Sequence, residues 1–209
     1  MARPADNYPV KRKELLTIAE NVFLQKGYEQ TNVDDILKAS GISKGAFYHY
    51  FKSKEEVLAA SIENMLDEAV AFLQPTVDDL SLGALEKFKQ FMEQKSKFQT
   101  TKLEYAALLG KLMQSDVFQL KYVMTMAQKM VPLFAKIIQQ GTDEGVFHVA
   151  YPYETADILI RAIVGIPNSS AYDEYMRDDE KRRRYLLSLR GVIAGTLGIE
   201  KNGFSVYDE

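Results

Sequence analysis

The sequence predicts an all-α protein of about nine helices, and three observations lead to that prediction. Apolar residues recur at helical spacing, first at Leu15, Ile18, Ala19, Val22 and Phe23. Residues typical of helix starts and stops separate the apolar stretches. No segment of strand length alternates strongly between apolar and polar residues, since 146–149 is too isolated to pair.

Three short helices are expected in the first 52 residues. The first helix stops before Gly27, which suits the position after a helix end. Asn32 caps a very short helix over 33–39, with acids in its first turn. Gly41 ends that helix, and Ser43 caps the next one, over 43–50.

Longer helices are expected after that point. Ser53 and Glu56 form a capping box that opens a helix over 54–73, which ends where Pro75 breaks the pattern. The others are expected over 82–98, 102–113, 116–144, 153–166 and 179–197. Pro132 should kink its helix, Gly145 should end it, and the acids 178–180 suit the start of the last helix.

This pattern predicts two domains. Residues 1–52 form the first, the helix over 54–73 links it to the second, and 54–200 form the second. The tail over 201–209 is expected to be loose.

The composition excludes several classes of protein. The 209 residues include no cysteine and only two histidines, so neither a metal site nor another cofactor is expected. The net charge of −3 argues against a protein that coats nucleic acid, but it leaves a local basic patch open. Without an apolar leader after Met1 or a stretch near the ~20 residues of a membrane helix, we expect no membrane contact and a cytoplasmic protein.

The second and third helices have the spacing of a helix-turn-helix. Gly41 can take the positive φ that the sharp turn needs. The small core that sets the helix angle is expected to contain Ile36, Ile42, Phe47 and Phe51. The opposite face of the third helix then carries Gly45, Tyr48, His49 and Lys52, with Ala46 at its border and Lys44 near its leading end.

That outward face has the chemistry of a DNA-reading surface. Gly45 and Ala46 allow close approach to base edges, and Lys44 can donate to guanine. Tyr48 and His49 can bond phosphate, as can the start of the next helix with Lys54. The N-terminal arm adds positive charge against the single Asp6, from Arg3, Lys11, Arg12 and Lys13.

Residues 10–60 closely resemble the DNA-binding domain of the TetR family of transcriptional regulators. The resemblance is carried by Phe23–Tyr28, Thr31–Ile36 and the run from Gly41 to Glu56; Ile137–Phe147 looks like the end of the family's seventh helix. It implies an all-helical homodimer with a divergent ligand domain, which releases DNA when a small effector binds. It places the recognition helix on 43–50, the DNA-facing positions on Lys44, Gly45, Ala46, Tyr48 and His49, and the phosphate-binding lysine on Lys54.

The last two long helices are candidates for the dimer interface, because small residues among large apolar ones allow close helix packing. The residues assigned to it are Leu159, Ala162, Ile163, Ile166, Leu189, Val192, Ile193 and Gly195. Two reading helices across a two-fold axis would read a palindrome in double-stranded DNA. The alternative is that both stripes belong to the internal core.

Aromatic and methionine side chains of the middle helices are candidates for an adaptable apolar pocket, although each one suits a core equally well. The assigned residues are Phe88, Phe91, Met92, Tyr105, Leu109, Met113, Met126, Met130, Phe134 and Arg161. Arg161 would pair with an anionic ligand or with an acid such as Glu104. A kink at Pro132 would open space beside Met130 and Phe134.

The sequence therefore predicts a ligand-responsive DNA-binding regulator, released by an apolar or amphipathic effector. The alternative is a ligand carrier or interaction protein with the same fold and no specific role on DNA. Repression and activation use the same contacts, with repression the expected mode. Signatures of enzymes are absent: there is no Gly-rich phosphate loop, no G-x-S-x-G and no H-E-x-x-H.

Overall fold

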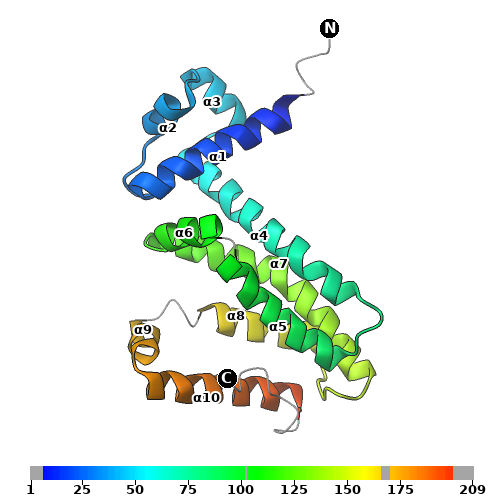
Figure 1. Cartoon of the computed structure of the whole chain (residues 1–209). Coiled ribbons are helices and arrows are strands. Elements are labelled where there is room, and N and C mark those ends of the chain that lie inside the picture. The colour runs from blue at the N-terminus through cyan, green and yellow to red at the C-terminus, as the bar shows by residue number, and fades with distance from the viewer. Residues whose placement is uncertain (1–6, 102, 166–169, 200–209) are drawn as a thin grey trace. The chain divides into compact units, whose positions relative to one another are not determined.

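The computed structural model describes residues 7–101, 103–165 and 170–199 of the chain (Figure 1). All regular structure in these ranges is helical, which confirms the predicted fold class. The helices are α1 (Tyr8–Lys26), α2 (Val33–Ser40), α3 (Lys44–Tyr50), α4 (Lys54–Asp78), α5 (Ala84–Thr101), α6 (Leu103–Leu112), α7 (Asp116–Asp143), α8 (Pro152–Gly165), α9 (Ser170–Arg177) and α10 (Asp179–Leu197).

The predicted signals at the ends of the short helices are confirmed. Asn32 and Asp35 form a reciprocal capping box at the start of α2. The Ser43 hydroxyl accepts a hydrogen bond from the Ala46 N–H at the start of α3. Gly41, with a φ of +67°, takes the left-handed conformation that ends α2 and turns the chain toward α3.

Two helices differ from the prediction. α4 does not stop before Pro75 but continues to Asp78, because Leu73 and Val77 on either side of the proline are both buried, one turn apart on the same face. α9 was not predicted. Its Tyr172 and Tyr175 pack against Tyr185 of α10, so tertiary ring contacts stabilise a short polar segment.

The described helices pack into two compact units. Unit 1 holds α1–α3, α4 up to Met65, the end of α5 from Gln99, α6 and the start of α7 up to Tyr122. Unit 2 holds the rest of α4, α5 and α7 together with α8–α10. These packing units differ from the functional division at residue 52, which remains a prediction. Among the described residues, no helix is both long and apolar enough to cross a membrane.

Unit 2 has an aromatic core. The Phe134 ring lies 5.5 Å from that of Phe88 and 5.9 Å from that of Phe91, between centroids. Phe147 folds back onto the end of α7, where a Cβ on Gly141 would lie 2.0 Å from its ring. Only glycine fits there, so the chain reversal after α7 depends on that residue.

Candidate nucleic-acid interface

The angle between α2 and α3 is set by a small apolar core in unit 1. Ile36, Phe47 and Phe51 are fully buried, as the sequence predicted, and Ile42 is half-buried. Because α3 has only seven residues, these contacts and its caps hold it in place rather than its own helical stability. The helix-turn-helix therefore holds α3 in a fixed orientation, with its opposite face turned away from this core.

That opposite face is open to solvent. Tyr48 is 45% exposed, Lys44, Gly45, His49 and Lys52 are also exposed, and Ala46 is half-buried at the border. An added Cβ on Gly45 would meet no other atom within 4 Å, so the glycine does not serve packing within the chain. The predicted exposure pattern is thus confirmed, while the contacts of these residues with DNA remain a prediction.

Lys54 is engaged within the protein. Its ammonium donates a 2.9 Å hydrogen bond to the backbone carbonyl of Tyr28 and lies 4.2 Å from the centre of the Tyr28 ring. The resemblance assigns this ammonium to a DNA phosphate, whereas the structure shows it stabilising the turn between α1 and α2. In this conformation it links the start of α4 to that turn.

The N-terminal arm is more ordered than the sequence suggested. Residues from Tyr8 onward are helical, and Pro9 stands in the first turn, where a missing N–H costs nothing. Lys11 pairs with Glu14 at 2.8 Å, and the Arg12 guanidinium lies 4.5 Å from the centre of the Phe51 ring. Arg3 and Asp6 lie outside the described residues.

Tyr8 was missed by the sequence reasoning. Its hydroxyl donates a 3.3 Å hydrogen bond to the backbone carbonyl of His49, and its ring contacts the rings of His49 and Tyr50. A signal was present, since continuing the apolar stripe of α1 backward from Leu16 in steps of four reaches Arg12 and then Tyr8.

A charged contact fixes α2 against the end of α1. The Lys26 ammonium lies 2.5 Å from a carboxylate oxygen of Asp35. That bond, together with the Asn32 N–H, holds the pKa of Asp35 below its ordinary value. Asp35 therefore acts twice, in the capping box of α2 and in the pairing of the two helices.

The residues assigned to a dimer interface divide into two groups. Ala162, Val192 and Gly195 are exposed, and Ile163 and Leu189 are half-buried. Leu159 and Ile193, at 4% and 2% exposure, are buried within unit 2, and the interface itself remains a prediction. Ile166 lies outside the described residues.

Other exposed residues extend the same stripes. Ile158 of α8 is 67% exposed and Val192 of α10 is 60% exposed. A Cβ on Gly165, Gly191 or Gly195 would meet no other atom within 4 Å. Packing among the described residues therefore does not require these glycines, and small residues permit the close approach of another helix.

Most of the residues assigned to an effector pocket lie in packed surroundings. Phe88, Phe91, Met130 and Phe134 belong to the core of unit 2, at 1–2% exposure. Met126 is also buried there, and Met92 is half-buried. Leu109 and Met113 are half-buried in unit 1, and the side chain of Tyr105 lies outside the described residues. That the residues assigned to the effector pocket line a cavity remains a prediction.

Arg161, also assigned to the effector pocket, lies in a polar environment on α8. Its side chain is exposed and pairs with Asp157, one turn earlier on α8, at 2.8 Å. The Asp157 bond also raises the pKa of the guanidinium further above its ordinary value.

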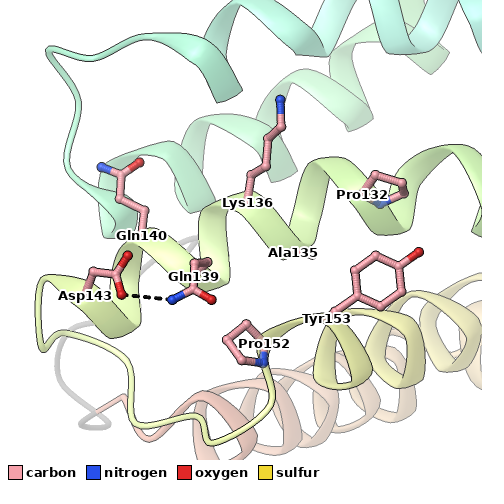
Figure 2. Close-up of a pocket in the computed structure, with 8 residues that line it drawn as sticks. All are labelled: Pro132, Ala135, Lys136, Gln139, Gln140, Asp143, Pro152 and Tyr153. Carbon is pink, nitrogen blue, oxygen red and sulfur yellow. Dashed lines mark hydrogen bonds between the residues drawn. The ribbon is translucent and has the colours of Figure 1, made fainter.

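A groove of about 500 Å³ lies beside Pro132 in unit 2 (Figure 2). Gln139 and Tyr153 point into the space between α7 and the start of α8, whereas Lys136 points away from α8. None of the residues assigned to the effector pocket lines it. This groove lies on the exposed side of α7, and the predicted space beside Met130 and Phe134 remains a prediction.

Comparison with known families gives two matches along the chain. Residues 15–61 match the model of the bacterial regulatory proteins of the tetR family, which covers the helix-turn-helix. Residues 110–165 match a tetracycline-repressor-like C-terminal domain, which covers α7 and α8. The two matches fall on the predicted reading and ligand domains respectively.

Similar proteins extend the likeness over most of the chain. The transcriptional regulator YfiR of Bacillus subtilis is 26% identical over 81% of this chain and 84% of its own. The transcriptional repressor KstR2 of Mycolicibacterium smegmatis is 28% identical over 78% of this chain and 79% of its own. SmeT, the repressor of a Stenotrophomonas maltophilia multidrug efflux pump, shares the fold, with a TM-score of 0.64, 20% identity and 92% coverage of both chains.

Proposed function

The chain belongs to the tetR family of bacterial regulatory proteins, and we propose that it is a repressor that binds a palindromic operator as a homodimer. As a member of this family it is a ligand-responsive, DNA-binding transcriptional regulator. The proposal that it represses follows KstR2, which is named a repressor and aligns with most of the chain. Its place of action is then the cytoplasm, where the bacterial chromosome lies.

The observation that carries the proposal is the exposed face of α3, a helix whose orientation is fixed by the apolar core of the helix-turn-helix. Lys44, Gly45 and Ala46 at its start are proposed to meet base edges in the major groove, where small residues permit close approach. Tyr48 and His49 would bond phosphates, which fix the register of the helix. Lys54 would contribute by holding the turn before α2. The free backbone N–H groups at the start of α4 would remain available to bind a phosphate.

The homodimer is proposed to form through α8 and α10. One helix of seven residues reads few base pairs, so two copies are needed to recognise a site of useful length. The exposed Ile158, Ala162 and Val192, with the open glycines Gly191 and Gly195, are suited to close helix packing. Val192→Glu should therefore sediment as a folded monomer. The control variant Leu80→Glu, at a loop residue that is 98% exposed, should sediment as a dimer.

The effector is proposed to be a small apolar or amphipathic molecule. The half-buried Leu109 and Met113, both of unit 1, could admit it by side-chain movement, since methionine and leucine adapt readily. Arg161 is exposed and paired with Asp157, so the proposal does not depend on an anionic group of the effector. An effector that prefers the conformation unable to bind DNA would release the operator by shifting the population toward it.

Selection of duplexes from a random-sequence pool tests the proposal. The expected result is enrichment of one palindrome, and reduced transcription when that site is placed across a promoter. Increased transcription would contradict the assignment as a repressor. Failure of a refolded, ligand-free dimer to enrich any sequence would contradict the role on DNA and favour a ligand carrier.

A further inference from the structure

We propose that Tyr8 is a positioning residue for DNA binding, which acts by holding the His49 side chain of α3 in one orientation. Tyr8 lies in the first turn of α1, and 41 positions of sequence separate it from His49. The inference rests on the proposed function, because that function places His49 at a DNA phosphate.

The contacts of Tyr8 converge on the C-terminal end of α3. The Tyr8 ring meets the His49 imidazole edge to face, at 5.2 Å between centroids and an angle of 88°. It also lies 5.0 Å from the Tyr50 ring, at 34°. The 3.3 Å hydrogen bond from its hydroxyl to the His49 carbonyl is long, so the rings carry most of the interaction.

His49 is thereby held between two tyrosines. Its imidazole meets the Tyr50 ring at 5.2 Å and 72°, in addition to its contact with Tyr8. An exposed histidine without such neighbours would sample several rotamers and lose that freedom on binding a phosphate. A histidine already held in one orientation loses less conformational entropy on binding. Tyr50 restrains His49 from within α3, and Tyr8 restrains it from α1.

The position of Tyr8 argues against a role in the core. Its side chain remains 36% exposed in spite of these contacts, so it packs on the solvent side of α3. One turn further along α1, Arg12 covers the buried Phe51 ring, which attaches α1 to the end of α3 independently. Loss of the Tyr8 ring should therefore free His49 while leaving the helix-turn-helix folded.

A double-mutant cycle tests this coupling. The dissociation constant for the selected duplex is measured for the parent, Tyr8→Ala, His49→Ala and the combined variant. We expect Tyr8→Ala to weaken binding roughly fivefold in the parent and less than about twofold once His49 is absent, the behaviour of coupled residues. Tyr8→Phe, which keeps the ring, should bind within about twofold of the parent.

Controls separate positioning from folding. Tyr151→Ala removes a tyrosine that is 70% exposed in unit 2 and should leave binding unchanged. Thermal unfolding establishes that each variant is folded. Tyr8→Leu, which keeps an apolar side chain but no ring at this position, replaces Tyr8→Ala if the latter unfolds.

Two results would overturn the inference while the proposed function stands: an equal effect of Tyr8→Ala with and without His49, or no effect of His49→Ala on a specific duplex. Absence of any specific duplex binding by the parent would instead refute the proposed function itself.

Discussion

The Ser115 hydroxyl donates a 2.5 Å hydrogen bond to the carboxylate of Glu29, across 86 positions of sequence. Ser115 also accepts from the Phe118 N–H at the start of α7, and it is only 4% exposed. Glu29 lies in the turn between α1 and α2. The turn before α7 is thus bonded to the turn before the helix-turn-helix, both within unit 1.

Ser115→Ala should lower the free energy of unfolding by about 2 kcal/mol, because it removes a bond to a charged group and a cap of α7. Chemical denaturation measures this difference. Ser81→Ala is the matched control, since its hydroxyl bonds only Asp79 nearby on the surface, and it should cost less than about 0.5 kcal/mol. If Ser115→Ala cost no more than the control, the bond would not be a structural tie.

Two glycines of the helix-turn-helix should respond to alanine in opposite ways. Gly41→Ala forces a positive φ on alanine and should destabilise the fold by about 1–2 kcal/mol, with no steric contribution because no atom lies near the added Cβ. Gly45→Ala should stabilise α3 by up to about 1 kcal/mol, because alanine favours helix and the site is open.

Gly45→Ala should nevertheless weaken operator binding, by about 1–3 kcal/mol if the methyl group costs one base contact. Thermal unfolding and DNA titration of the same samples measure both effects. A more stable variant that binds less well would identify Gly45 as a residue of the reading face. Tighter or unchanged binding would remove it from that face.

Burial, reinforced by the carboxylates of Glu55 and Glu29, raises the pKa of Tyr28 from 10.0 to about 12. Above pH 10 the unfolded chain releases this proton while the folded chain keeps it. The stability contributed by the neutral phenol should therefore be lost as the pH rises from about 10 through about 12.

Tyr28→Phe removes the phenol, so the variant should lose less stability than the parent as the pH rises. The urea midpoints of both proteins at pH 8 and pH 11 measure the loss of stability. The lysines also titrate in this range, but both proteins contain the same lysines, so the difference between the two losses reports on Tyr28. Parallel losses in the parent and the variant would show that the phenol is not the group responsible.

Local signals explain why the helix-turn-helix was predictable. The caps at Asn32 and Ser43 and the turn at Gly41 lie within a few residues of the backbone groups that they satisfy. The exposed face of α3 follows from the helical period once Phe47 and Phe51 are placed inward. No long-range contact was needed for either result.

The differences in α4 and α9 came from long-range contacts. α4 passes Pro75 because Leu73 and Val77 are buried, and α9 forms against Tyr185, neither of which a local pattern reveals. A core stripe and an interface stripe have the same composition, so the sequence did not separate the buried Leu159 and Ile193 from the exposed Val192. Core and pocket side chains are likewise the same residue types, so Phe88 and Phe134 could not be separated from a cavity lining.

The affinity of Tyr48→Ala for the selected duplex tests the central claim most directly, namely that the exposed face of α3 reads DNA. Tyr48 is 45% exposed, so its loss should leave the unfolding temperature nearly unchanged. The account predicts that specific binding weakens by about 1–3 kcal/mol in Tyr48→Ala and stays at the parent level in Tyr151→Ala. A Tyr48→Ala protein that binds the duplex as tightly and as selectively as the parent would contradict the account.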